Sequence, residues 1–116
     1  MSDPTTDKPI DLDILAELSE TIRARKTETA QASYTAKLLR GGVGDCAKKL
    51  GEEAIETVIA AVAGDGEQLA EETADLLYHL LVTLEAANVS LADVMAVLRR
   101  RQGLSGLDEK ASRTSS

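Results

Sequence analysis

The chain has 116 residues, enough for one domain, and carries 20 acidic against 13 basic side chains for a net charge of −7. The acidic balance argues against nucleic acid as a general partner, because it leaves no dominant basic surface for phosphates. No stretch approaches the ~20 apolar residues of a membrane span, so no membrane partner is expected.

A flexible tail over residues 1–10 precedes the first predicted helix, 12–25. Leucine and isoleucine recur there at helical spacing, and Asp11 is placed to cap the helix. The polar segment 26–32 predicts a loop.

Two helices are predicted next. Ser33 caps a short helix over 34–40, and the glycine pair at 41–42 would end it, since glycine adopts the conformation that a helix end needs. Asp45 would then cap a longer helix over 46–63, with an apolar stripe along one face.

The Gly-Asp-Gly segment at 64–66 predicts a turn into a helix over 67–87, which Asn88 ends. Ser90 caps a last helix over 91–102. No segment alternates apolar and polar residues as a strand would. The chain is therefore predicted to be all-α, with four or five helices.

One folded domain, 11–103, should precede a partly disordered tail over 104–116. The chain has no Trp, no Phe and two Tyr, so aliphatic side chains must fill its core. Such a small core leaves apolar surface uncovered, and we expect a second copy of the chain to cover it. The single cysteine, Cys46, permits no internal disulfide; it is expected to be a core residue of a cytoplasmic protein.

Four acidic residues form two pairs, Glu53 and Glu56 on one predicted helix and Glu72 and Asp75 on the next. A spacing of three places both members of a pair on one helix face. The turn at 64–66 makes the two helices antiparallel neighbours, with Glu53 level with Asp75 and Glu56 level with Glu72. We therefore expect two facing rows of carboxylates, ~4.5 Å apart along the axis.

Facing carboxylates repel one another unless a cation lies among them. Oxygen ligands without Cys or His favour Mg²⁺, with Mn²⁺ possible, and such ions act on phosphoanhydrides by neutralising phosphate oxygens and activating water. The alternative is an ordinary solvated surface on which Lys48 and Lys49 pair with nearby glutamates. A di-iron carboxylate bundle is excluded, because it needs Glu-x-x-His pairs and Leu76 precedes the only histidine, His79, by three residues.

These acidic residues belong to a longer pattern. Its parts are Ser33-Tyr34-Thr35, Lys37-Leu38, Lys48-Lys49-Leu50-Gly51-Glu52-Glu53, Glu72-x-x-Asp75-Leu76-Leu77-Tyr78-His79 and Leu98-Arg99-Arg100-Arg101. The pattern resembles the MazG-like all-α nucleoside triphosphate pyrophosphohydrolases and, within them, the phosphoribosyl-ATP pyrophosphohydrolase family. The resemblance covers roughly residues 12–101.

The resemblance implies a MazG-like helical bundle, completed as a four-helix-type bundle in a homodimer. It implies Mg²⁺-assisted hydrolysis of phosphoribosyl-ATP to phosphoribosyl-AMP and pyrophosphate, the second step of histidine biosynthesis. The catalytic and metal-binding positions would be Glu53, Glu56, Glu72 and Asp75, and Glu52 could hold a water or a second ion.

Further residues are candidates for binding substrate: Lys48, Lys49, Tyr34, Lys37, Arg99 and Arg100. Each has a plainer interpretation. The lysines can pair with glutamates, the tyrosine can pack in a core or interface, and the arginines can offset the helix dipole. His79 is either a packed side chain or one that positions a metal ligand.

Two other functions stay open. A pyrophosphatase that removes unwanted nucleoside triphosphates would share the acidic pattern but need no site for an added phosphoribosyl group. A helical dimerisation protein without catalysis would show no specific response to divalent ions.

Overall fold

The computed structural model describes residues 8–102, which contain four helices and no strand. The helices are α1 (Asp13–Arg25), α2 (Tyr34–Ala63), α3 (Gly66–Ala86) and α4 (Leu91–Arg101). The prediction of an all-α chain is confirmed for this part. The tail expected at 104–116, the last residue of the expected domain, Gly103, and residues 1–7 of the expected N-terminal tail lie outside the described residues.

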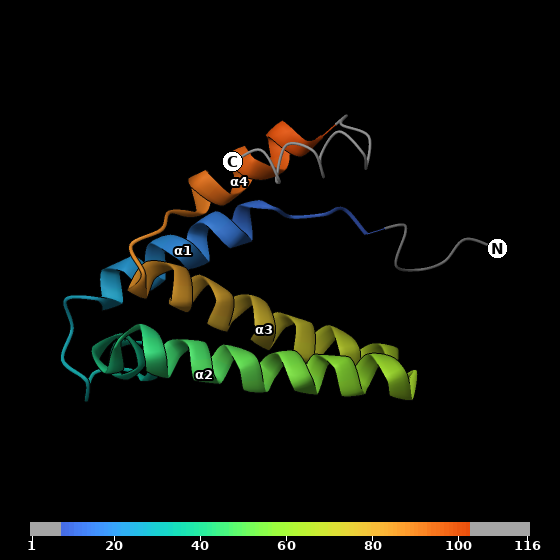
Figure 1. The fold of residues 1–116 in the computed structure, drawn as a ribbon, viewed down its shortest axis with the longest axis horizontal. Helices are drawn as coiled ribbons and strands as arrows, with labels where there is room; N and C mark the ends of the chain where they lie inside the picture. The colour runs from blue at the N-terminus through green and yellow to red at the C-terminus, as the bar shows by residue number, and fades with distance from the viewer. Residues whose placement is uncertain (1–7, 103–116) are drawn as a thin grey trace, which may run out of the picture.

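Helices α2 and α3 form an antiparallel hairpin, in which they lie side by side (Figure 1). Gly64 ends α2 with a φ of 77°, a left-handed conformation that favours glycine. The Asp65 side chain caps α3 by accepting a hydrogen bond from the Gln68 amide at 3.1 Å. The predicted turn at 64–66 is therefore confirmed, and it makes the two helices neighbours.

The core lies at the end of the hairpin that is far from this turn, where α1 packs against α3 and α2 (Figure 1). Its buried members are Ile22, Leu38, Cys46, Leu81 and Val82. The Cys46 thiol donates a hydrogen bond to the Leu38 carbonyl at 3.2 Å, and burial, with the nearby Asp45 carboxylate, raises the pKa of the thiol. Cys46 is thus the packing residue that the sequence predicted.

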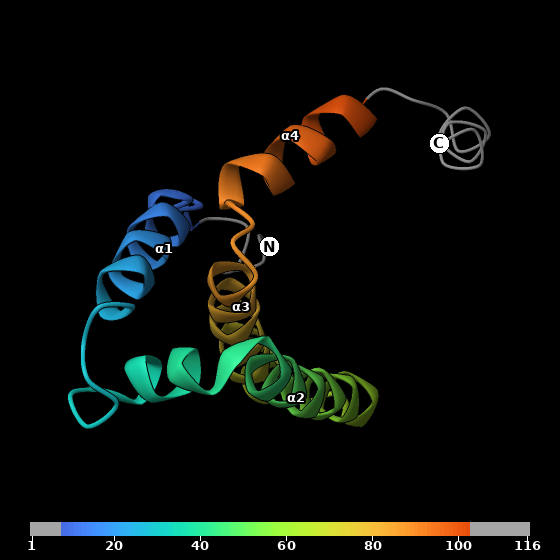
Figure 2. The ribbon, with the colours of Figure 1, turned by 60° about the vertical axis from the view of Figure 1, so that its left-hand side comes forward.

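Helix α2 follows its prediction in part. Ser33 caps it as expected, accepting from the Ala36 amide at 3.0 Å, and the helical conformation is interrupted at the glycine pair, as predicted. At Gly42, whose φ is 85°, the helix kinks, and it resumes at once in a new direction (Figure 2). Asp45 does not cap a new helix: it lies one turn beyond the bend, with its carboxylate against Gly41, where a Cβ would clash.

Helix α1 also begins one residue later than predicted. Leu12 occupies the cap position with no side-chain hydrogen bond to the helix, and Asp11 accepts from the Asp13 amide at 3.1 Å. The other end of α1 is tied to α3, since Glu85 pairs with Arg23 at 3.3 Å and with Lys26 at 3.5 Å.

Helix α4 contributes little to the core. Ser90 caps it as predicted, accepting from the Asp93 amide at 3.1 Å, yet none of its residues is buried. Figures 1 and 2 show it projecting away from the α2–α3 hairpin. Among the described helices, none is long and apolar enough to cross a membrane alone. Helices α3 and α4 reach that length and apolar character only when taken together, and their axes are bent by 110° relative to one another.

The half of α2 nearest the turn exposes an apolar face. The predicted stripe does exist, but four of its members are 58% to 84% exposed: Ile55, Val58, Ile59 and Val62. One chain therefore leaves uncovered a surface that its aliphatic composition should hide from water.

Candidate metal centre

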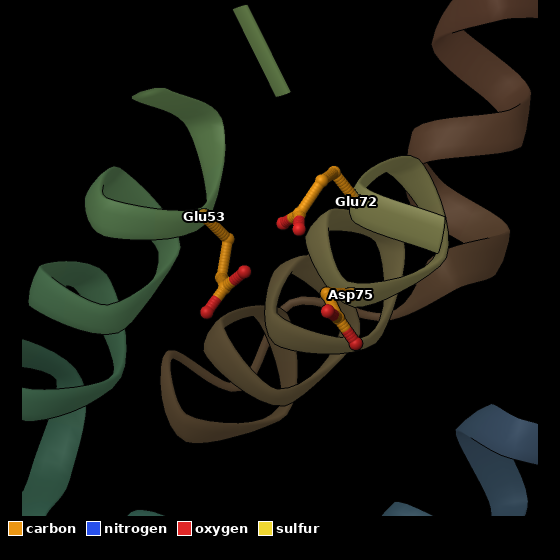
Figure 3. A group of neighbouring side chains, drawn as sticks. All are labelled: Glu53, Glu72 and Asp75. Carbon is orange, nitrogen blue, oxygen red and sulfur yellow. The ribbon is translucent and has the colours of Figure 1, made fainter. Parts of the chain in front are cut away.

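Three carboxylates meet midway along the hairpin. Glu53 comes from α2, and Glu72 and Asp75 come from α3 (Figure 3). One carboxylate oxygen of each lies within 4.8 Å of those of the other two. Glu53 and Glu72 are half-buried, and Asp75 is exposed. The structure thus brings together three of the four acidic residues that the sequence analysis paired.

The contact between the helices explains why Glu56 does not join this group. The Thr57 hydroxyl lies within hydrogen-bonding distance of the Glu53 carbonyl at 2.8 Å and of the Glu72 carbonyl at 3.2 Å. Thr57, not Glu56, therefore faces α3 at the level of Glu72. Successive helical residues differ by ~100° in direction, so the Glu56 side chain points away and is exposed.

Thr57 is a site residue that the sequence analysis missed, and Gln68 is another. The Gln68 side-chain amide donates to Glu72 Oε1 at 2.6 Å and so orients that carboxylate. Its position four residues before Glu72 on the same helix was the available signal, because such residues are neighbours on a helix surface.

The group has the chemistry of a hard-cation site. Within residues 8–102 none of its three carboxylates forms an ion pair with a lysine or arginine. Like charges this close repel one another unless a cation lies among them. Three oxygen donors without Cys or His are the ligand type that Mg²⁺ and Mn²⁺ prefer.

A hollow of about 370 Å³ lies at the bend-proximal part of α2. It is lined by the two candidate lysines, Lys48 and Lys49, together with Leu38, Asp45 and Glu52. Lys49 pairs with Glu52 at 3.4 Å, and this contact, with a smaller contribution from Tyr34, raises the pKa of Lys49. Glu52 thus pairs with a lysine instead of joining the three carboxylates, while Lys48 is exposed.

Three rings gather where α2 begins beside α3. The Tyr34 ring stacks on that of Tyr78, with centroids 6.5 Å apart, and both meet His79 edge-on, at 6.1 and 4.9 Å. Tyr78 hydrogen-bonds Thr35, and burial raises the pKa of the Tyr78 phenol. His79 is buried, and Tyr34 is half-exposed.

The remaining candidates lie apart from this group. Lys37 is exposed on the first part of α2. Arg99 and Arg100 occupy the last turn of α4, and Figure 1 shows α4 and α2 on opposite sides of the molecule. Within one chain, the two arginines are therefore not brought to the carboxylates.

Residues 15–102 match the family described as phosphoribosyl-ATP pyrophosphohydrolase. The chain belongs to this family.

Individual relatives agree with the family match. A phosphoribosyl-ATP pyrophosphatase of Parvibaculum lavamentivorans is 62% identical over 99 residues, which cover 85% of this chain and 91% of the relative. A protein of the same name from Dinoroseobacter shibae is 55% identical, over 88% of this chain and 100% of its own length. Another from Paracoccus denitrificans is 56% identical, over 85% of this chain and 92% of its own length. The matched segment of the family includes all three clustered carboxylates.

Proposed function

We propose that this protein hydrolyses phosphoribosyl-ATP to phosphoribosyl-AMP and pyrophosphate, a step of histidine biosynthesis. The observation that carries the proposal is the carboxylate group of Glu53, Glu72 and Asp75, which lies inside the segment that the pyrophosphohydrolase family matches. The names of the close relatives support the same substrate.

In this proposal, Glu53, Glu72 and Asp75 hold Mg²⁺ or Mn²⁺, for which their oxygens are suitable ligands. The ion would neutralise phosphate oxygens and make a bound water a better nucleophile. Gln68 keeps Glu72 oriented, and Thr57 ties the two helices that carry the ligands. Glu56 and Glu52 remain candidates for a further ligand or a bound water, since each lies on the same helix as Glu53 and within one turn of it.

The lysines of the hollow are suited to the phosphates. Lys48 is exposed and Lys49 is engaged by a single carboxylate, so both can offer an ammonium group to phosphate oxygens. Tyr34 and Lys37, at the start of α2, are proposed to contact the nucleoside part of the substrate.

We further propose that the protein acts as a homodimer. The exposed apolar face of α2 is the part of the surface that most needs a cover. A second copy would also resolve the position of Arg99 and Arg100. These residues lie away from the carboxylates of their own chain, so they would contact substrate only where α4 of one copy approaches the site of the other.

The test is pyrophosphate release by the purified protein with Mg²⁺, comparing phosphoribosyl-ATP with ATP and a panel of deoxynucleoside triphosphates. We expect a strong preference for phosphoribosyl-ATP and loss of release when the metal is chelated. Preference for a plain nucleoside triphosphate would instead indicate a pyrophosphatase that removes unwanted nucleotides. No release from any substrate, with or without metal, would indicate a helical dimerisation protein.

A further inference from the structure

His79 connects the proposed metal site to the edge of the substrate site. It is only 7% exposed, although it is the sole histidine of the chain. Its Nδ1 lies 2.8 Å from the Asp75 carbonyl oxygen, and its Nε2 lies 3.4 Å from the Tyr34 hydroxyl. The ring therefore bridges α3 and the first residue of α2.

The Asp75 contact determines where the proton of the ring lies. A carbonyl oxygen only accepts hydrogen bonds, so the Nδ1 that faces it must carry a proton. In the neutral imidazole, Nε2 is then an acceptor. While the ring is neutral, the Tyr34 hydroxyl that faces Nε2 is therefore the donor of that second hydrogen bond.

This arrangement limits what Tyr34 can offer to a ligand. A phenol has a single proton, and here His79 takes it, so the hydroxyl presents only lone pairs on its other side. The Tyr34 residue is 51% exposed, so a ligand can approach it. A phosphate oxygen is itself a hydrogen-bond acceptor, so it has no proton to donate to the lone pairs of the Tyr34 hydroxyl.

We propose that His79 is a positioning residue that holds the Tyr34 hydroxyl as a hydrogen-bond acceptor, so that Tyr34 selects a donor group of the substrate, a ribose hydroxyl or an amino group of the base, and not a phosphate. The inference rests on the proposed function for the identity of the substrate. The orientation of the hydroxyl does not depend on it.

The orientation is tested by ¹⁵N NMR of the single histidine, in mildly alkaline buffer and without substrate. We expect a protonated Nδ1 and an unprotonated Nε2 whose signal moves in Tyr34→Phe. The matched control is Tyr78→Phe, which removes the other phenol of the same ring group and should leave the Nε2 signal in place. A proton on Nε2 in the wild-type protein would overturn the proposal, whatever the enzyme hydrolyses.

The role in selection is tested by kinetics with phosphoribosyl-ATP. Tyr34→Phe should raise KM about tenfold, the value of one lost hydrogen bond, and change kcat less than about threefold, because a contact to the nucleoside is made equally in ground and transition states. Tyr78→Phe should leave KM unchanged. Inhibition by inorganic pyrophosphate should be the same in wild type and Tyr34→Phe; weaker inhibition of the variant would show that the hydroxyl contacts phosphate and would refute the proposal.

Competition with nucleotide analogues identifies the donor. ATP, 2′-deoxy-ATP, 3′-deoxy-ATP and purine riboside triphosphate, which lacks the amino group, would each be titrated against both proteins. An analogue that binds wild type and Tyr34→Phe with the same affinity lacks the group that Tyr34 contacts. If KM for phosphoribosyl-ATP rises while no analogue responds, the donor is a hydroxyl of the added phosphoribosyl group. An unchanged KM for phosphoribosyl-ATP would refute the proposal and leave the proposed function intact, whereas no turnover by wild type would refute the function alone.

Discussion

The α2–α3 hairpin and helix α4 begin with the same kind of side-chain cap but differ in how they pack. Both regions carry well-formed caps, at Ser33 and Asp65 for the hairpin and at Ser90 for α4. The hairpin packs its helices together and gathers three carboxylates, whereas α4 buries none of its residues. A cap decides where a helix begins, but only packing against another element decides which of its side chains can act together.

The largest effect that would sharpen this comparison is on catalysis. Asp75→Asn keeps the size of the side chain and removes a proposed metal ligand, so we expect pyrophosphate release to fall by about a thousandfold. Glu71→Gln, an exposed neighbour outside the carboxylate group, is the control and should retain activity. If Asp75→Asn retains full turnover with an intact fold, the carboxylates are not the catalytic centre.

The next effect concerns the uncovered face of the hairpin. Val62→Glu places a charge on the most exposed member of the apolar face and should weaken the homodimer by about a hundredfold, since the charge would be removed from water at the interface. Light scattering across a range of protein concentrations measures the dissociation. Thr21→Glu adds the same charge on α1 and should not change assembly; equal loss in both variants would argue against an α2 interface.

The hairpin and α4 should also differ in how much a buried side chain contributes to the free energy of unfolding. Val82 is 0% exposed, so Val82→Ala should lower the free energy of unfolding by ~2 kcal/mol. Val97→Ala removes the same two methyl groups from α4 and should cost less than ~0.5 kcal/mol. Urea unfolding at a fixed protein concentration measures both values. A similar cost for Val97→Ala would mean that α4 is buried against a partner in solution.

The smallest effect compares the two serine caps. Ser33→Ala should lower the free energy of unfolding by ~1 kcal/mol, because α2 cannot fray without disturbing the core. Ser90→Ala removes an equivalent hydrogen bond but should only loosen α4. Hydrogen exchange should then quicken in α4 amides while the urea midpoint stays unchanged. A midpoint shift as large as that of Ser33→Ala would show that α4 folds cooperatively with the rest.

Most helix ends could be predicted from the sequence because the interactions that determine them are local, although Asp11 and Asp45 do not cap the helices that they were expected to cap. Ser33, Ser90 and the 64–66 turn determine helix ends through hydrogen bonds and dihedral angles within a few residues. The break at Gly42 was also predicted, since glycine tolerates the positive φ found there. The start of the following helix was placed too late, because the helix resumes directly after the break and Asp45 lies inside it.

The acidic pairs, the short turn between them and the family of the chain were therefore determined by sequence alone, since spacing on a helix puts carboxylates on a common face. Tertiary structure decided which of them meet. The rotation of α2 against α3 turns Thr57 toward the Glu72 carbonyl, brings Glu53 to Glu72 and Asp75, and leaves Glu56 outside. It also decided the His79 bridge from Asp75 to Tyr34, because a hydrogen bond between residues 45 positions apart depends on how two helices pack and not on the spacing within either.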